Sequence, residues 1–262
     1  MIRSLTTAAT GMVVQQRNLD VIANNLANIN TTAFKANRAE FQDLMYQTLR
    51  VAGAEQGGGT LLPAAQQVGM GAKFVSNATS FNVGPLQATG NPLDIAINGN
   101  GMFAVTLQDG TTAYTRDGGF KLDSAGTFVT SDGFPLSGNI TVPAEVQTIS
   151  ISANGTVSAI VGGESEPQVL GQITLVMFTN PSGLERIGKN LYRANVASGP
   201  ATETEPGLNG SGTLEQGFLE GSNVQLVDEM VRMILAQRAY EVNSKAIQTA
   251  DEMLNSTNSI KR

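Results

Sequence analysis

The sequence contains no histidine, and this absence restricts the chemistry open to the protein. Histidine is the commonest general base near neutral pH and the commonest metal ligand. An enzyme built on this chain would depend on carboxylates, lysine, tyrosine or serine instead. We therefore expect a non-enzymatic protein with no catalytic residues, no cofactor and no metal site.

Cysteine and tryptophan are also absent, and charged residues make up only 15% of the chain. Without cysteine there is no disulfide and no thiolate metal site, which fits extracytoplasmic and cytosolic proteins equally. The formal net charge is −6, and no cluster of lysine and arginine occurs. Nucleic acids and anionic membranes require such clusters, so we expect neither as a partner.

Long hydrophobic runs are missing as well. No stretch of 18 apolar residues occurs, so the sequence predicts no membrane span. The residues from Ile2 to Leu26 are periodic, with Gln15, Gln16 and Arg17 in the middle, unlike the apolar core of a cleavable signal peptide. If the protein is exported, we expect a route without a cleaved signal.

Heptad spacing is the main feature of the first thirty residues. Steps of three and four residues connect Ile2, Leu5, Ala9, Met12, Gln16, Leu19, Ala23 and Leu26. This spacing, here called the N-terminal seam, predicts an amphipathic helix with a stripe along one side. We expect the helix to end between Asn28 and Thr32, where asparagine and threonine side chains compete for backbone hydrogen bonds.

A second long helix is predicted from Ser222 to Arg262, a run without glycine or proline. Ser222 and Gln225 fit a capping box at its start. Its C-terminal seam, with one member every seven residues, consists of Leu226, Met233, Tyr240, Ile247 and Leu254. A second apolar line runs through Leu235, Ala239, Val242, Ala246, Thr249 and Met253. The apolar arc is therefore broad enough for two neighbours.

The interior of the chain is patterned for strands. From Lys73 onward apolar and polar residues alternate, and hairpin-forming dipeptides recur. They are Asn98-Gly99, Asp109-Gly110, Asp117-Gly118, Asp132-Gly133 and Asn154-Gly155. This pattern predicts small antiparallel sheets or a small barrel. The fold class is therefore α+β, with long terminal helices packed as a coiled-coil-like core domain and an antiparallel β region between them.

The terminal helices are longer than one intramolecular partner requires, so we infer that helices of neighbouring subunits complete a bundle or tube. An intramolecular helical hairpin is the alternative. The sequence predicts four parts: a helical core domain of residues 1–32 and 222–262, an arm and glycine-rich insertion of residues 33–72, a connecting β domain of residues 73–95 and 198–221, and an outer β domain of residues 96–197.

Two segments of the arm leave their structure open. Ala33 to Arg50 fits either a helix or an extended arm. Val51 to Met70 is rich in glycine, alanine and glutamine, with three consecutive glycines. That composition is typical of a disordered linker, and the alternative is a loop that becomes ordered only against a neighbouring subunit.

Several motifs resemble those of bacterial flagellar rod and hook proteins. The N-terminal motif is ANNLANINTTAFK, ending at Lys35, and the C-terminal motif includes GFLEGSNV and QRAYE. The interior stretches NPLDIAINGNGMFAV and AYTRDGGFKLDSAGTFVTSDGFPL are also similar. The motif residues singled out are Asn24, Asn25, Leu26, Ala27, Asn28, Phe34, Lys35, Gln237, Arg238, Ala239 and Tyr240. Length, insertion and motif order are most similar to the distal-rod members of that family.

The resemblance implies a structural, self-assembling protein of the flagellar basal body. Its subunits would form a helical tube that transmits torque from motor to hook and forms part of the export channel. The implied partners are further copies of the chain, proximal-rod proteins, the hook protein, the surrounding P-ring and L-ring proteins and the type III export apparatus. The implied location is the periplasm up to the outer membrane.

One position departs from the family pattern. Ala33 precedes Phe34-Lys35 where the family usually has glycine. If this position needs a positive φ, alanine is the costlier residue.

Two other functions remain open on the sequence alone. Another rod or hook protein of the same family would share these motifs. A secreted carbohydrate-active protein is the hypothesis from a different functional class. Its candidate carboxylates are Asp94, Asp109, Asp117, Asp123 and Asp132. Most of these aspartates lie in turn dipeptides, and the absence of tryptophan disfavours a sugar-stacking cleft.

Overall fold

The computed structural model describes residues 2–53, 63–138, 140–143, 145–162 and 166–260. The chain forms two compact units. The helical unit contains Met1–Ala27, Asn37–Thr79 and Gln225–Arg262, and the β unit contains Asn28–Ala36 and Ser80–Val224. The finer four-part division stays a prediction.

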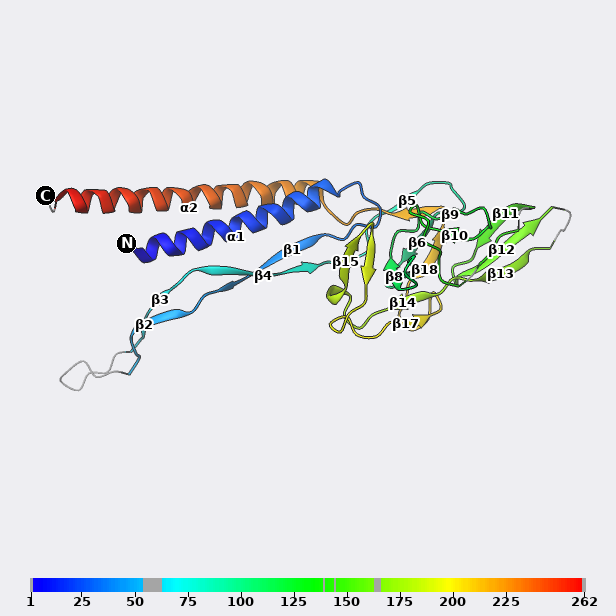
Figure 1. Ribbon diagram of the computed structural model, residues 1–262, viewed down its shortest axis with the longest axis horizontal. Helices are drawn as coiled ribbons and strands as arrows, with labels where there is room; N and C mark the ends of the chain where they lie inside the picture. The colour runs from blue at the N-terminus through cyan, green and yellow to red at the C-terminus, as the bar shows by residue number, and fades with distance from the viewer. Residues whose placement is uncertain (1, 54–62, 139, 144, 163–165, 261–262) are drawn as a thin grey trace. The chain divides into compact units, whose positions relative to one another are not determined.

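Two antiparallel helices form the first layer of the helical unit. Helix α1 (Ile2–Ala27) and helix α2 (Leu226–Ile260) lie side by side, with both chain ends at the same end of the pair (Figure 1). This confirms that the terminal helices pack together, and α1 ends close to the predicted stop. No helix in the described part of the chain is both long and apolar enough to cross a membrane.

The predicted capping box at Ser222 is wrong, because α2 begins only at Leu226. The Ser222 hydroxyl accepts a hydrogen bond from the Val224 amide at 3.3 Å, two residues on. The Gln225 carbonyl accepts the Glu229 amide at 3.0 Å and starts the helical pattern. The Asn223 amide donates to the Phe34 carbonyl at 3.3 Å, so the residues before the helix are tied to another segment.

A two-stranded ribbon completes the helical unit. Strand β1 (Asn37–Asp43) pairs with β4 (Ala72–Thr79), and β2 (Tyr46–Arg50) pairs with β3 (Gln66–Gly69), all antiparallel. The segment from Ala33 to Arg50 is therefore extended rather than helical. Near the C-terminal end of the Val51 to Met70 insertion the chain forms strand β3, which corrects the expectation of an unstructured linker there. Residues 54–62 of the insertion lie outside the described part.

The β unit consists of short strands. Their bounds are β5 (Leu86–Ala88), β6 (Ile95–Asn98), β7 (Phe103–Thr106), β8 (Thr112–Thr115), β9 (Lys121–Leu122), β10 (Phe128–Val129), β11 (Val146–Ile151), β12 (Thr156–Val161), β13 (Gln168–Gln172), β14 (Leu175–Met177), β15 (Glu185–Gly188), β16 (Leu191–Arg193), β17 (Thr202–Thr204), β18 (Thr213–Gln216) and β19 (Phe218–Glu220), with a 3₁₀ turn, η1, at Pro181–Gly183.

These strands form small antiparallel sheets, as predicted, and the described strands close no barrel. The larger sheets have the orders β15-β16-β8-β7 and β11-β12-β13. The remaining strands of the β unit pair as β9 with β10, β14 with β17, β6 with β18 and β5 with β19. The last two pairs join strands far apart in sequence, so the end of the β unit folds back onto its beginning.

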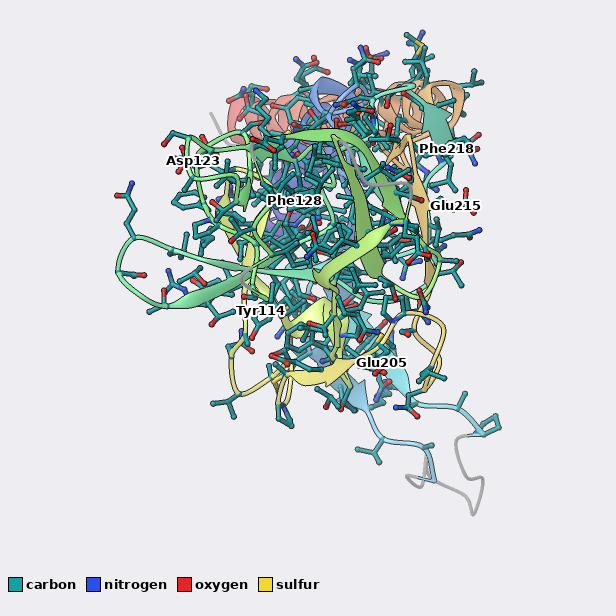
Figure 2. All side chains as sticks on the ribbon, turned by 90° about the vertical axis from the view of Figure 1, so that its right-hand side faces the viewer. Tyr114, Asp123, Phe128, Glu205, Glu215 and Phe218 are labelled. Atoms are coloured by element: carbon teal, nitrogen blue, oxygen red, sulfur yellow. The ribbon has the colours of Figure 1, made fainter. Side chains whose placement is uncertain are left out.

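Aromatic rings form the centre of the main hydrophobic core. Phe120 makes edge-to-face contacts with Phe103 at 5.1 Å and Phe128 at 6.5 Å between ring centroids. Figure 2 shows Phe128 in the interior and Asp123 at the periphery. A smaller cluster contains Tyr114 and Phe178, 4.8 Å apart. Offset and edge-to-face rings stabilise a core beyond their buried area.

The predicted glycine turns have two different causes. Gly110, Gly133 and Gly155 adopt positive φ at tight reversals. Gly99 also has a positive φ, but the hairpin predicted there is wrong, because β6 pairs with β18 and not with β7. Gly118 does not adopt positive φ. A Cβ atom there would collide with the Ile95 carbonyl oxygen, so this glycine permits a close approach of two backbones.

Ala33 adopts the left-handed conformation, with φ of 56°. It is buried, and its amide donates to the Glu220 carbonyl at 2.7 Å. An L-residue in this region costs roughly 1–2 kcal/mol relative to glycine. The buried methyl group offsets part of that cost, since a methyl-sized group contributes about 0.8 kcal/mol when buried.

We predict that Ala33→Gly changes the free energy of unfolding by no more than about 1 kcal/mol, because strain relief and lost burial oppose each other. Ala33→Val is expected to destabilise by about 2 kcal/mol or more, because a β-branched residue is strained at this φ and crowded when buried. Urea unfolding followed by tyrosine fluorescence measures both. Wild-type stability of the valine variant would show that the turn can relax.

Candidate functional site

Helices α1 and α2 pack against each other, with Asn25 close to Glu229 and Gly11 close to Asn243. The buried positions on α1 are Ala8, Val14, Ile22 and Asn25, and those on α2 are Glu229, Ala236 and Ala250. Asn243 continues the α2 line at the same seven-residue spacing and is half-buried. A Cβ atom added to Gly11 would lie 2.9 Å from the Asn243 amide nitrogen, so glycine permits close helix packing there.

The N-terminal seam lies beside this contact rather than in it. Ala8, Gly11, Ile22 and Asn25 each precede a seam residue by one position, and one residue corresponds to a rotation of about 100° around the helix. In the structure Leu5, Met12, Leu19 and Leu26 are half-buried, and Ala9, Gln16 and Ala23 are exposed. The side chain of Ile2 lies outside the described part.

The C-terminal seam divides in the same way. Met233, Ile247 and Leu254 are half-buried, whereas Leu226 and Tyr240 are 44% and 40% exposed. In the second apolar line, Leu235, Val242 and Met253 are exposed.

Four exposed apolar residues in the first turns of α2 were missed by both lines: Val227, Met230, Val231 and Ile234. We call Val227, Met230, Val231, Ile234 and Leu235 the outer face of α2. Val227, Met230 and Ile234 are three and four residues apart, so they form a further apolar stripe that the two predicted lines did not include.

Asn25, predicted as a motif residue, joins three elements of the helical unit. Its side-chain oxygen accepts the Asn37 amide at 2.9 Å, and its nitrogen donates to the Asn37 carbonyl at 2.8 Å. The same nitrogen approaches the Glu229 carboxylate at 3.4 Å. Buried polar groups require such partners, so Asn25 fixes the start of β1 against both helices.

The other motif residues of the helices have different environments. Asn28 is half-buried, and its side-chain oxygen accepts the Thr31 hydroxyl at 3.1 Å. Arg238 pairs with Glu241 at 2.9 Å on the surface of α2. Asn24, Ala27 and Gln237 are exposed, and Ala239 is half-buried.

Lys35 is fully buried in the β unit, in an ion cluster with Glu220 and Arg116. The Lys35 ammonium donates to Glu220 Oε1 at 2.5 Å and to the Asn82 carbonyl at 2.7 Å. The Arg116 Nε donates to Glu220 Oε2 at 2.8 Å. One buried carboxylate therefore balances two buried cations, and each ion depends on the others for compensation.

Backbone groups satisfy the remaining donors of Arg116. Its guanidinium donates to the carbonyls of Gly101 at 3.0 Å, Gly99 at 2.9 Å and Ile97 at 3.2 Å. Local sequence patterns do not reveal this cluster, because its three ions are far apart in the chain. The only sequence signal for the three ions was that each lies in a motif similar to those of flagellar rod and hook proteins.

Burial, and after it the nearby Arg116 charge, lower the pKa of Lys35 from 10.5 to about 8. The charge of the Glu220 carboxylate and its hydrogen bond to Lys35 act in the opposite direction and raise the pKa of Lys35.

Phe34, the residue before Lys35, stacks against the Arg186 guanidinium at 5.2 Å from the ring centroid. Arg186 also donates to the Lys35 carbonyl at 2.6 Å.

The five candidate aspartates have local structural roles. Asp94 accepts from Thr89 and Asn91, Asp109 from Thr111, and Asp117 from the Gly119 amide. Asp123 accepts from the Ser124 amide, and Asp132 pairs with Lys189 at 3.6 Å. These bonds stabilise turns and account for aspartate without any catalytic role.

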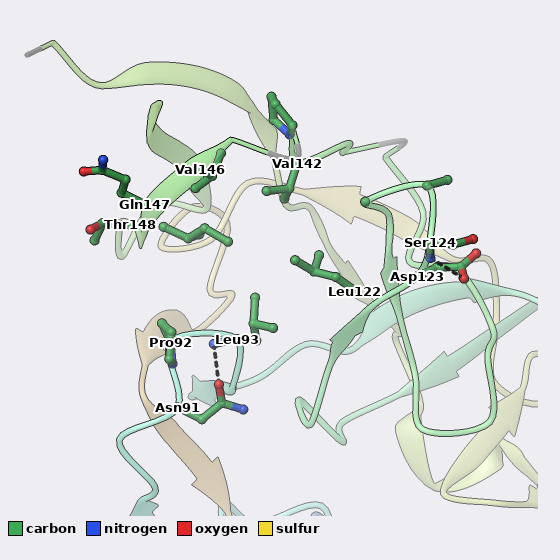
Figure 3. A pocket seen from close by; sticks show the side chains of 14 residues that line it. Asn91, Pro92, Leu93, Leu122, Asp123, Ser124, Val142, Val146, Gln147 and Thr148 are labelled. Carbon is green, nitrogen blue, oxygen red and sulfur yellow. Dashed lines mark hydrogen bonds between the residues drawn. The ribbon is translucent and has the colours of Figure 1, made fainter. Parts of the chain in front are cut away.

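A groove of about 550 Å³ in the β unit is lined by Leu93, Leu122, Val142, Val146 and Asp123 among others (Figure 3). Its lining includes no aromatic side chain and a single carboxylate. Sugar-cleaving sites need two carboxylates, and sugar-binding clefts favour aromatic stacking. The groove therefore does not support the hypothesis of a carbohydrate-active protein.

Long paired terminal helices with an exposed apolar face, together with a body of small antiparallel sheets, define a structural assembly protein. Three family models match the chain: "Flagella basal body rod protein" over residues 5–35, "Flagellar hook protein FlgE/F/G D1 domain" over residues 96–159 and "Flagellar basal body rod FlgEFG protein C-terminal" over residues 215–260.

Similar proteins from other bacteria narrow the family. The chain is 50% identical to the flagellar basal-body rod protein FlgG of Borreliella burgdorferi over the full length of both chains. It is 44% identical to FlgG of Bacillus subtilis but 32% identical to that organism's flagellar hook-basal body complex protein FlhP, each over full length. The chain belongs to the FlgG family of flagellar basal-body rod proteins.

Members of this family are structural, so the protein is a non-enzymatic subunit of the distal rod of the flagellar basal body. This confirms the family resemblance and the distal-rod interpretation. Membership also implies assembly into the rod with other flagellar components.

We predict that Lys35→Met lowers the free energy of unfolding by about 2–4 kcal/mol, because Glu220 and the Asn82 carbonyl lose a buried charged donor. Lys121→Met, an exposed lysine of β9, is the matched control and is expected to change stability by less than about 0.5 kcal/mol. Urea unfolding measures both. Equal stabilities of the two variants would contradict a structural role for the buried ammonium.

Stability should also depend on the ionisation of Lys35. Between its folded pKa of about 8 and its unfolded value of 10.5, the unfolded chain holds a proton that the folded chain has released. The free energy of unfolding therefore rises with pH in this window. Burial raises the pKa of Tyr192 above 10, so that residue lowers stability at still higher pH.

The measurement is urea unfolding of the wild type and Lys35→Met between pH 7 and 10. We expect the stability advantage of the wild type to grow above pH 8. An advantage that stays constant across this range would show that Lys35 titrates normally.

Proposed function

We propose that copies of this chain polymerise through their terminal helices into the helical tube of the distal rod, which carries torque from motor to hook and whose lumen forms part of the export channel. The observation that carries this proposal is the outer face of α2. Val227 and Leu235 are 71% and 64% exposed. The buried residues of α2 are Glu229, Ala236 and Ala250, none of them a large aliphatic residue.

In an isolated helical hairpin the largest apolar residues face inward, whereas on α2 most of them are exposed. Contiguous exposed apolar patches mark interaction surfaces. The half-exposed N-terminal and C-terminal seams extend the available surface. We infer that both seams and the outer face of α2 pack against helices of neighbouring subunits.

Membership of the rod family supports the remaining partners that we propose. Proximal-rod proteins and the hook protein would continue the tube at its ends, and the P-ring and L-ring proteins would surround it. The subunits would reach this place, in the periplasm up to the outer membrane, through the type III export apparatus without a cleaved signal.

The test uses the double variant Val231→Ser, Ile234→Ser in the full chain. Burying two such side chains contributes at least about 3 kcal/mol, so the critical concentration for polymerisation should rise by roughly a hundredfold or more. Gln248→Ser, on an exposed polar position of α2, is the control and should polymerise like the wild type. Polymer yield is measured by sedimentation and electron microscopy.

Unchanged assembly of the double variant would exclude the outer face of α2 as a subunit contact. The urea unfolding of the β unit should remain at its wild-type midpoint, because neither residue belongs to that unit.

A further inference from the structure

The chain passes between its two units four times, after Ala27, Ala36, Thr79 and Val224. In the β unit, the residues at three of these crossings are held by a single side chain, that of Asn223. Its oxygen accepts the Ala36 amide at 2.7 Å. Its nitrogen donates to the carbonyls of Ser80 at 2.9 Å and Asn82 at 3.1 Å.

The backbone closes this set of contacts. The Ser80 amide donates to the Ala36 carbonyl at 2.9 Å, so the first two of these segments also bind each other. The Asn223 amide donates to the Phe34 carbonyl. Asn223 therefore binds segments distant in sequence through its side-chain nitrogen, its side-chain oxygen and its backbone amide.

The side chain and backbone of Glu220, in the last of these segments, bind the other two a few residues further in. Its Oε1 accepts both the Gly84 amide at 2.8 Å and the Lys35 ammonium. Its carbonyl accepts the Ala33 amide. Residues 33–36, 80–84 and 220–223 thus form one hydrogen-bonded cluster within the β unit, here called the collar.

The helical unit begins with a comparable set of bonds. Asn25 binds both backbone groups of Asn37, and the Asn37 side-chain oxygen accepts the Thr79 hydroxyl at 2.9 Å. Asn37 and Thr79 are therefore hydrogen-bonded within the helical unit, and their chain neighbours Ala36 and Ser80 within the β unit.

A helix cap is the simpler role for an asparagine just before α2. The contacts exclude it, because α2 begins at Leu226 and the side-chain bonds of Asn223 go to Ala36, Ser80 and Asn82 instead. Three bonds to other segments are more than a cap requires.

We propose that Asn223 is a positioning residue that holds three chain crossings as one bundle, so that a twisting force on the terminal helices enters the β unit through several segments together. A single segment can rotate about its φ and ψ angles, whereas hydrogen-bonded neighbouring segments cannot rotate independently. The inference rests on the proposed function, because it concerns the load carried by the polymer.

The test compares polymers of wild type, Asn223→Ala and Asn195→Ala. Asn195 is the matched control: its side-chain oxygen accepts the amides of Ala197 at 2.8 Å and Ser198 at 3.0 Å, all within one loop of the β unit. Persistence length is measured by electron microscopy. We expect Asn223→Ala to shorten it by about twofold or more through the loss of three hydrogen bonds, and Asn195→Ala to leave it unchanged.

Hydrogen exchange of the monomer supplies a local readout. The Ala36 amide should exchange about fivefold faster in Asn223→Ala, since one lost hydrogen bond contributes roughly 1 kcal/mol to its protection. Asn223→Asp keeps the acceptor for Ala36 but loses both donors. In this variant the Ala36 amide should exchange at the wild-type rate, while the persistence length of the polymer should still be shorter. The aspartate variant therefore tests the inference even if the alanine variant does not assemble.

Polymers of both Asn223 variants that are as stiff as those of Asn195→Ala would overturn the inference and leave the proposed function intact. A wild-type chain that forms no tube would instead remove the proposed function.

Discussion

The β unit depends on one buried carboxylate. Glu220 lies between Lys35 and Arg116, and none of the three has a substitute partner of opposite charge within the cluster. Isolated buried charges are strongly unfavourable, so the three segments that carry these ions must meet for any of them to be buried. Glu220 thereby connects the segment that follows α1, the end of β8 and the last strand before α2.

Arg116 extends this dependence into the sheets. Its bonds to the carbonyls of Ile97, Gly99 and Gly101 fix the turn between β6 and β7, next to the aromatic core. The turn requires positive φ at both glycines. The ion cluster is therefore coupled to the hydrophobic core through backbone geometry as well as through charge.

The terminal helices follow a different principle. Alanine, glycine and asparagine allow α1 and α2 to approach closely, but such residues bury little apolar surface. Apart from the buried Val14 and Ile22, the described large aliphatic side chains of the two helices are half-buried or exposed, which leaves apolar surface for other helices to cover. Such a helix pair is better suited to an assembly than to an isolated subunit, which agrees with its membership of a rod family.

Much of this was predictable from local pattern. Heptad spacing identified both helices, and asparagine or aspartate before glycine identified most of the turns, because these signals act within a few residues. The sequence did not reveal that the helix contact is rotated one residue from the N-terminal seam. Heptad spacing marks a stripe of apolar residues, whereas the actual contact depends on side-chain size and on the Asn25 bonds to Asn37 and Glu229.

The sequence by itself determined the fold class through periodicity and the family through motifs at both ends, and the non-enzymatic character follows from the family. Tertiary structure alone decided which strands pair, that Ala33 is left-handed, and that Lys35, Arg116 and Glu220 share one buried site. Contacts between distant segments carry no periodic signal, since their energy depends on burial and geometry that exist only after the chain has folded.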